Sequence, residues 1–244
     1  MGSLEGKVAL VSGAARGIGA AIAQLLASEG ASVLLGDVRD DLGIDQARSI
    51  GEAAVYRHLD VRRPDDWQGA VSEAVSDFGK LDILVNNAAI VAYGLIEDFS
   101  EEDFIAVFEV NQLGCFLGMK AVVGAMERSG GGSIVNISSG AGLRGSPQAF
   151  AYSTTKWALR GMTKAAAMDL ARHKIRVNSI HPGPIETEML KEWTGDQREK
   201  RLKSVPMRRT GSVDEVAQAV LFLLSDEASY ITGAEVAVDG GVTV

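Results

Sequence analysis

The chain contains a single cysteine, Cys115, among its 244 residues. One thiol cannot form an internal disulfide, so nothing in the sequence points to an oxidising compartment. No uninterrupted apolar run approaches the roughly 18 residues that a membrane-spanning helix needs, and the amino terminus lacks the apolar core of a signal peptide. The first residues resemble a myristoylation site, but Gly6 stands where serine or threonine is required. The expected location is therefore cytoplasmic.

Basic residues are also scarce, because 24 Lys and Arg face 32 Asp and Glu and give a net charge of −8. This balance disfavours a nucleic-acid surface. The three histidines, His58, His173 and His181, are scattered along the chain, and no cysteine or carboxylate completes a metal-ligand set beside them. We therefore expect no metal site. With 46% hydrophobic and 23% charged residues, the composition is that of a globular protein and excludes disorder, collagen-like repeats and a coiled coil.

Short β-branched runs alternate with longer segments of helical period along the whole chain. The strand-like runs span 8–11, 33–35, 54–59, 83–85, 134–137, 176–180 and 235–238. The helical segments span 17–29, 42–50, 65–78, 101–127, 151–172 and 213–225. Most strands are apolar on both faces, so helices should cover the sheet on each side. The order predicts an α/β fold, a single doubly wound Rossmann domain over residues 1–244 with a parallel sheet of about seven strands.

The segment 184–212 departs from this alternation. It is polar and charged, yet it carries the apolar residues Met189, Leu190, Trp193 and Met207. A mobile lid over a substrate and a pair of surface helices would both explain this mixture. We interpret the segment as a substrate lid.

A glycine cluster, Gly13, Gly17 and Gly19, directly follows the first predicted strand and precedes a helix. Glycines here allow the backbone to approach a pyrophosphate, which the unpaired N–H groups and positive dipole end of the helix would bind. The spacing is Gly-x-x-x-Gly-x-Gly and differs from the Gly-x-Gly-x-x-Gly of the standard dinucleotide fingerprint. A tight structural turn is the alternative interpretation.

The second predicted strand is followed by Asp37, 24 residues beyond Gly13. A carboxylate there would accept hydrogen bonds from the adenosine ribose hydroxyls and repel a 2′-phosphate, which favours NAD over NADP. Two arginines, Arg16 and Arg39, could instead meet a 2′-phosphate. Because repulsion between a desolvated carboxylate and a phosphate costs several kcal/mol, we let Asp37 decide. A helix-capping or solvated aspartate is the alternative.

Tyr152 and Lys156 lie four residues apart on a predicted helix and so share a face. Such pairs are also common as packing residues. The strand 134–137 ends in Ser138 and Ser139, at the edge where doubly wound sheets bind ligands. An ammonium about 4 Å from a phenol contributes roughly 4 kcal/mol at an effective dielectric near 20. That energy is worth about three pKa units, so we expect Lys156, assisted by the positive nicotinamide ring of a bound cofactor, to bring the pKa of Tyr152 toward working pH.

In this order and at this spacing, the motifs resemble those of the short-chain dehydrogenase/reductase family over essentially the whole chain. The residues that carry the resemblance are Gly13, Gly17, Gly19, Asp60, Val61, Asn86, Asn87, Ala88, Asn111, Ser139, Tyr152, Lys156 and the run 182–187. One departure is that Ala89 replaces the final glycine of the usual Asn-Asn-Ala-Gly. More narrowly, the segments 153–160, 176–183 and 229–235 are similar to those of bacterial NAD-dependent hydroxysteroid dehydrogenases.

The resemblance implies a catalytic set of Asn111, Ser139, Tyr152 and Lys156. Tyr152 would act as the general acid/base, Ser139 would bind the substrate oxygen, Lys156 would hold the nicotinamide ribose, and Asn111 would anchor a proton-relay water. A polar residue that kinks its helix is the alternative for Asn111. The expected NAD-binding residues are Gly13, Arg16, Gly17, Ile18, Gly19, Asp37, Val38, Asp60, Val61, Asn87, Ala88, Ala89, Tyr152, Lys156, Pro182, Gly183, Ile185 and Thr187.

The residues expected around the substrate are mostly apolar, which favours a hydrophobic secondary alcohol or its ketone over a sugar. They are Val91, Tyr93, Ala141, Leu143, Gln148, Met189 and Trp193. A hydroxysteroid or another cyclic alcohol fits this description. The alternatives are a 3-oxoacyl-thioester reductase, a polyol dehydrogenase and a catalytically silent NAD-binding protein. The helices 101–127 and 151–172 are apolar on more than one face, so we expect self-association; the resemblance implies a homotetramer.

Overall fold

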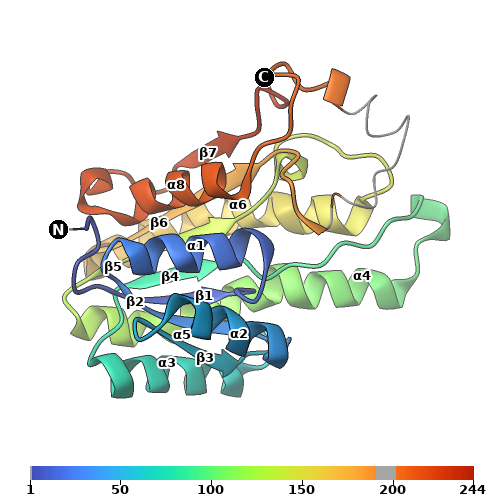
Figure 1. The fold of residues 1–244 in the computed structure, drawn as a ribbon. Helices are drawn as coiled ribbons and strands as arrows, with labels where there is room; N and C mark the ends of the chain where they lie inside the picture. The colour runs from blue at the N-terminus through green and yellow to red at the C-terminus, as the bar shows by residue number, and fades with distance from the viewer. Residues whose placement is uncertain (1, 189, 191–201) are drawn as a thin grey trace.

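The computed structural model describes residues 2–188, 190 and 202–244. In this part of the chain seven parallel strands form one twisted sheet, in the order β3-β2-β1-β4-β5-β6-β7 (Figure 1). The strands are β1 (Val8–Ser12), β2 (Ser32–Asp37), β3 (Ala54–His58), β4 (Ile83–Asn86), β5 (Gly132–Ile137), β6 (Ile175–Pro182) and β7 (Glu235–Val238). The predicted Rossmann fold is therefore confirmed, and the strand order changes direction between β1 and β4.

Helices cover both faces of the sheet. Their bounds are α1 (Gly17–Ser28), α2 (Asp40–Ile50), α3 (Pro64–Phe78), α4 (Glu101–Phe108), α5 (Gly114–Arg128), α6 (Phe150–Leu170) and α8 (Val213–Leu224). Single 3-10 turns occur at η1 (Ile96–Asp98), η3 (Gly140–Gly142), η4 (Ala171–His173) and η6 (Asp226–Ala228).

The core consists of two apolar layers, one on each face of the sheet. On one face α1 and α8 pack together, through residues such as Ile22 and Val220, against the β1, β2 and β5 side chains. On the other face α3, α5 and α6 contribute residues such as Trp67, Val122 and Leu159. Successive strand residues point to opposite faces, so strands that are apolar throughout supply both layers.

Local signals fix several helix ends. Pro64 begins α3, where its missing N–H costs no intrahelical hydrogen bond, and Asp65 and Asp66 lie in the first turn. Gly79 ends the same helix in the left-handed conformation, with φ 83°. The Ser212 side chain begins α8 by accepting from the N–H of Glu215, whose carboxylate accepts from the N–H of Ser212.

The predicted helix 101–127 consists of α4, a π-helical turn η2 (Glu109–Leu113) and α5. By length and mean hydropathy the stretch Glu101–Arg128 would suffice to cross a membrane. The stretch is not an uninterrupted apolar run, because Glu109, Asn111 and Lys120 lie within it. Core helices pass the same test, and here Val107, Val122 and Met126 are buried within the domain.

Candidate active site

A cavity of about 1360 Å³ opens at the carboxyl ends of the strands and spans the β1–β4 switch point. Ligands of doubly wound sheets bind in this crevice. The structure brings most of the predicted cofactor residues to its wall. Those that line it are Gly13, Arg16, Gly17, Ile18, Asp37, Val38, Asp60, Val61, Asn87, Ala88, Ala89, Tyr152, Lys156, Pro182, Gly183, Ile185 and Thr187.

The glycine turn between β1 and α1 leaves no room for side chains on its inner side. Gly13 has φ +65°, and a Cβ there would lie 2.7 Å from the Cα of Ala88. A Cβ on Gly19 would lie 2.1 Å from the carbonyl oxygen of Gly13, so Gly19 supports the turn from behind the cavity wall. Gly17, with φ +58°, faces space instead, since its nearest neighbour would be Thr187 Cγ2 at 3.7 Å. The turn therefore fits the close approach of a pyrophosphate to the α1 N-terminus.

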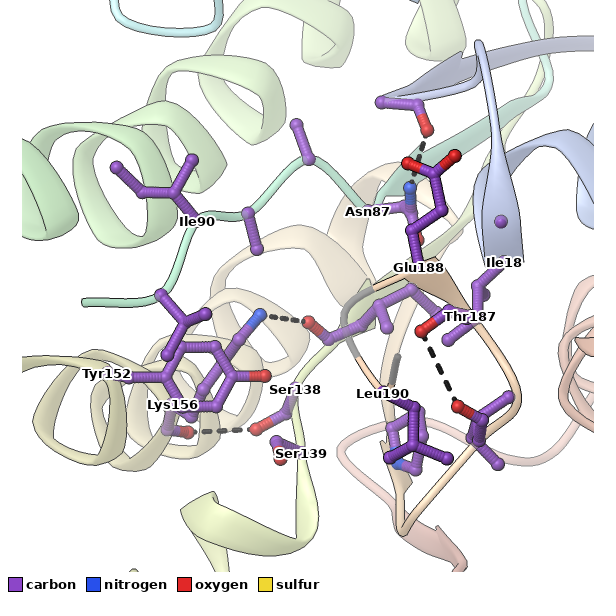
Figure 2. A pocket seen from close by; sticks show the side chains of 18 of the residues that line it. Ile18, Asn87, Ile90, Ser138, Ser139, Tyr152, Lys156, Thr187, Glu188 and Leu190 are labelled. Atoms are coloured by element: carbon purple, nitrogen blue, oxygen red, sulfur yellow. Dashed lines mark hydrogen bonds between the residues drawn. The ribbon is translucent and has the colours of Figure 1, made fainter. Parts of the chain in front are cut away.

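Asn87 fastens the end of β4 to this turn. Its Nδ2 donates to the carbonyl oxygens of Ser12, at 3.0 Å, and Gly13, at 2.9 Å. In return the Ser12 hydroxyl accepts from the N–H groups of Asn87, at 3.1 Å, and Ala88, at 3.3 Å. These bonds fix two walls of the cavity relative to each other across the switch point (Figure 2).

Asp37 lies at the end of β2 with its carboxylate held by backbone donors. Oδ2 accepts from the N–H of Ala15 and Oδ1 from that of Arg39, both at 3.0 Å. The Tyr56 hydroxyl donates to the Asp37 carbonyl oxygen at 2.7 Å and so supports the loop from β3. The Arg16 guanidinium pairs with Glu188. Among the described contacts, neither Arg16 nor Arg39 forms an ion pair with Asp37.

Asp60 follows β3 at the far end of the cavity. The Arg62 guanidinium lies 2.6 Å from its Oδ2, and the hydrogen bond from Arg62 holds the pKa of Asp60 below its usual value. The carboxylate is therefore ionised at neutral pH and faces the region next to Val61, which also lines the cavity.

Ser139, Tyr152 and Lys156 converge on the other side of the cavity (Figure 2). Tyr152 and Lys156 project from the first two turns of α6, and the Lys156 Nζ lies 5.5 Å from the centre of the Tyr152 ring. Ser139 follows β5, and its Oγ accepts from the N–H of Ala141 at 3.1 Å. Ser138 points away from this group, because its buried hydroxyl donates to the Lys156 carbonyl oxygen at 2.9 Å.

In the chain without a bound nicotinamide, the pKa of Tyr152 is raised and not lowered. Burial is the largest influence and raises the pKa of Tyr152, while a hydrogen bond with Ser139 opposes this shift. Burial also lowers the pKa of Lys156 to about 8. The Lys156 Nζ donates to the Ile137 carbonyl oxygen at 2.8 Å. Loss of hydration disfavours both the charged form of Tyr152 and the charged form of Lys156. Sequence spacing does not indicate how deeply the two side chains are buried.

Asn111 lies in the π-helical turn and is 1% exposed, but it does not line the main cavity. Its Oδ1 accepts from the Ile90 N–H at 2.8 Å, and its Nδ2 donates to the Ile90 carbonyl oxygen at 2.9 Å. A third bond, of 3.2 Å, joins Nδ2 to the Thr155 hydroxyl on α6. The side chain therefore braces the strand β4 exit against α6, and its role in a proton relay stays a prediction.

The residues predicted to contact the substrate divide into three groups. Val91, Tyr93 and Ala141 line the cavity. Leu143 and Gln148 do not, since Gln148 is exposed, has φ 61°, and uses its carbonyl oxygen to accept from Gly94 N–H at 2.8 Å. Met189 and Trp193 lie outside the described residues, as do residues 191–201 of the expected lid 184–212.

The cavity also has walls that the sequence analysis missed. They include Val110, Arg144, Pro147, Ala149 and the near-terminal Val242. Val242 is brought there by a turn in which Asp239 accepts from the N–H groups of Gly241 and Thr243, at 2.8 and 3.0 Å. An aspartate followed by Gly240 and Gly241 indicates such a turn, but the sequence does not show that the turn returns to the cavity.

Comparison with known proteins agrees with this geometry. A family model described as enoyl-(acyl carrier protein) reductase matches residues 13–243. A 3-alpha-(or 20-beta)-hydroxysteroid dehydrogenase of Mycobacterium tuberculosis is 46% identical, over 98% of this chain and 90% of its own length. A trans-4-hydroxycyclohexanecarboxylate dehydrogenase of Sinomonas cyclohexanicum is 45% identical, over 97% and 93%. A cyclopentanol dehydrogenase of Comamonas testosteroni is 44% identical, over 100% and 99%.

The glycine turn leads to a first prediction. Gly13→Ala places a methyl group 2.7 Å from the Ala88 backbone at a left-handed φ, so we expect at least about tenfold weaker binding of NADH, measured by its fluorescence. Gly124→Ala is the control, because Gly124 is exposed on α5 and a Cβ there would lie 3.5 Å from Arg128 Nη1, an ordinary van der Waals contact. Equal NADH affinity in both variants would contradict the role given to the turn.

Proposed function

The chain belongs to the short-chain dehydrogenase/reductase family, and we propose that it interconverts a hydrophobic secondary alcohol and its ketone with NAD(H). The observation that carries this proposal is the convergence of Ser139, Tyr152 and Lys156 beside the same cavity as the glycine turn. Dehydrogenases of the family use a nicotinamide cofactor, which accepts or supplies the hydride when bound. The protein has to bind that cofactor, orient the substrate oxygen and move one proton.

Tyr152 is the proposed general acid/base at the substrate oxygen. Burial raises the pKa of Tyr152, so the free protein holds the proton that ketone reduction requires. For alcohol oxidation the same oxygen must lose its proton, which a cation within the site favours. Lys156, buried and turned toward the ring, is the residue of this chain that supplies positive charge there.

Ser139 is proposed to orient the substrate oxygen by a hydrogen bond. Its hydroxyl already accepts from the Ala141 N–H at 3.1 Å, so the serine proton remains free to be donated. A donor fixed on one side and Tyr152 on the other would restrict where the substrate carbonyl can lie. Such positioning lowers the barrier by pre-organising the reacting groups.

We propose a place along the cavity walls for each part of the dinucleotide. The glycine turn would bind the pyrophosphate and Asp37 the adenosine ribose, while Asp60 and Val61 would flank the adenine. Lys156 would hold the nicotinamide ribose, and the run from Pro182 to Thr187 would contact the carboxamide. Asn111 is proposed to anchor a water that passes protons to solvent.

The preference for NAD rests on Asp37. Both carboxylate oxygens face backbone donors, and the group lines the cavity where a 2′-phosphate would have to lie. Arg16, the cation best placed to offset that repulsion, is paired with Glu188. Together these contacts favour a ribose with free hydroxyls.

The proposed substrate is a bulky, apolar secondary alcohol such as a hydroxysteroid or a cyclic alcohol. Val91, Ala141, Pro147 and Val242 give the cavity apolar walls beside the catalytic group. The relatives named for steroid, cyclohexane and cyclopentane substrates fit such a site. The alternative is a 3-oxoacyl-thioester reductase, since a relative from Thermotoga maritima that is 41% identical over 99% of this chain is named a 3-oxoacyl-[acyl-carrier-protein] reductase. We propose the segment 184–212 as the lid over this substrate.

We also propose that the protein is a homotetramer. Large apolar side chains on α4, α5 and α6 remain exposed in one chain, which disfavours an isolated monomer. They are Phe104, Ile105, Phe108, Phe116, Phe150, Trp157 and Met168. Sedimentation velocity measures the assembly directly, and a monomer at micromolar concentration would overturn this proposal.

Tyr152→Phe removes the phenolic proton and leaves the packing of the ring. We expect turnover of a cyclic alcohol panel, followed by NADH absorbance, to fall by about 10²–10⁴-fold. NADH affinity should stay within about twofold, because the ring still fills the same space. Tyr230→Phe is the control, since Tyr230 is fully exposed. Activity retained in Tyr152→Phe would exclude Tyr152 as the acid/base.

The two directions of reaction should respond differently to pH. Because the pKa of Lys156 is about 8, its positive charge is present below pH 8 and lost above it. This cation favours loss of the Tyr152 proton, so we expect kcat/KM for alcohol oxidation to fall through about pH 8, whereas ketone reduction, which needs protonated Tyr152, should show no fall from this cause. Lys156→Arg keeps a charge at alkaline pH, so its residual oxidation activity should lose the fall near pH 8. An unchanged profile in Lys156→Arg would contradict the assignment.

NAD should bind at least about tenfold more tightly than NADP, because a carboxylate beside a 2′-phosphate costs several kcal/mol. Asp37→Asn should remove most of this difference, mainly by strengthening NADP binding, while Asp45→Asn on exposed α2 should leave it intact. Calorimetric titration of both cofactors measures the ratio. Equal affinities in the unmodified protein would refute the role of Asp37.

A further inference from the structure

His181 lies near the end of β6, between the sheet and the Ser139 loop, and is fully buried. Its Nδ1 lies 3.2 Å from the Ser139 carbonyl oxygen, and its Nε2 lies 2.9 Å from the Ser179 hydroxyl. The main cavity does not include His181 among its lining residues. The side chain therefore contacts the backbone of Ser139, and any effect on the substrate passes through that serine.

The partners determine which nitrogen carries the proton. A carbonyl oxygen can only accept, so Nδ1 must donate to Ser139. In a neutral ring Nε2 is then the acceptor, and the Ser179 hydroxyl donates to it at 2.9 Å in preference to the more distant Ala234 carbonyl oxygen at 3.4 Å. Both ring nitrogens are satisfied by a neutral imidazole, and no donor or acceptor is left over.

Pro182 interrupts the backbone hydrogen bonds between β6 and β5, which explains why a side chain makes the next contact. The N–H groups of Ser179 and Gly183 point to β7, where they bond Ala234 and Val238. Because backbone N–H groups alternate in direction along a strand, the N–H of Ile180 points to β5, and an N–H at position 182 would point there too. Residue 182 is a proline without an N–H, so the ladder from β6 ends one step before the Ser139 loop.

Other contacts hold the loop as well, and the Ser139 carbonyl oxygen accepts from the Gly142 N–H at 2.8 Å in addition to its contact with His181. The Ser138 hydroxyl bonds the Lys156 carbonyl oxygen, and Arg160 Nη1 donates to the Gly142 carbonyl oxygen at 3.2 Å. His181 completes this set at the residue between them. The backbone that carries the His181 ring is held in place, because β6 is hydrogen-bonded to a strand on each side.

We propose that His181 is a positioning residue for the reaction: its neutral imidazole, protonated at Nδ1, fixes the Ser139 carbonyl and thereby aims the Ser139 hydroxyl at the substrate oxygen. This inference rests on the proposed function of Ser139. It gives a mechanistic role to a histidine that the sequence suggested only as a residue scattered beside a strand.

The charged groups near the ring are consistent with a neutral histidine. Arg160 and Lys156 disfavour a further positive charge, and Glu235 favours one but is paired with Arg160 at 3.0 Å. Glu235 is also paired with Lys164 at 3.1 Å. Burial has the largest effect and lowers the pKa of His181, which favours the neutral imidazole.

The first experiment observes His181 in the free, full-length protein by nitrogen-15 NMR of labelled histidine, assigned with His181→Asn. We expect a neutral ring with its proton on Nδ1 from pH 6 to pH 8. A ring that titrates in this range, or one protonated on Nε2, would overturn the inference. This measurement needs no substrate, so it judges His181 even if the panel of alcohols gives no turnover and the proposed function fails.

The second experiment compares three substitutions. His181→Leu removes the donor at similar volume, and we expect kcat to fall about tenfold with unchanged NADH affinity. His181→Asn places an amide near the position of Nδ1 and should recover most of kcat. His181→Gln reaches the position of Nε2 and should behave like His181→Leu. His173→Leu, on η4 beside Glu127, is the control and should keep the full kcat.

A double-mutant cycle identifies the route of the effect. If His181 acts through Ser139, adding His181→Leu to Ser139→Ala should change kcat by less than about twofold. A full additional loss in that background would overturn the inference while leaving the proposed function intact. Equal loss in the asparagine and leucine variants, with both folded by circular dichroism, would overturn it as well.

Discussion

The buried amine of Lys156 is the constraint on which the site depends. A cation that is 2% exposed has lost most of its hydration, which lowers its pKa to about 8 and would be costly without a partner. The Ile137 carbonyl oxygen at 2.8 Å provides one, at the point where β5 ends. This bond requires α6 to lie directly against the strand, and so it brings Tyr152, one turn earlier, to Ser139.

The neighbouring backbone is shaped to permit that close docking. A Cβ on Gly142 would lie 2.7 Å from the Lys156 carbonyl oxygen, so only glycine fits between the loop and the helix. The same carbonyl oxygen accepts from Ser138. The loop after β5 is therefore bound to α6 by the residue before Ser139 and by the space left at Gly142. Ser139 lies between these two attachments, so its position depends on how the helix docks.

The sequence predicted the fold and the convergence of Ser139, Tyr152 and Lys156 beside one cavity, because both are recorded in local patterns. β-branched runs located the strands, and the four-residue spacing of Tyr152 and Lys156 placed them on one face of a helix. The electrostatics could not be predicted in the same way: spacing suggested a lowered pKa for Tyr152, whereas burial raises it. Val242 was missed because it reaches the cavity through a tertiary turn, and Gln148 was misplaced because its backbone adopts φ 61°.

The departure at Ala89 is explained by how the segment after β4 is held. In the described chain the non-glycine residues with positive φ are Gln148, Lys174 and Arg208, so position 89 does not require glycine for its conformation. Asn87 is bonded to the glycine turn before it, and Ile90 is bonded to Asn111 after it. Both ends of the segment are thus fixed to different elements, one from each side of the switch point. The methyl group of Ala89 therefore lies on the cavity wall between two attachments, the Asn87 bonds to the glycine turn and the Asn111 bonds to Ile90.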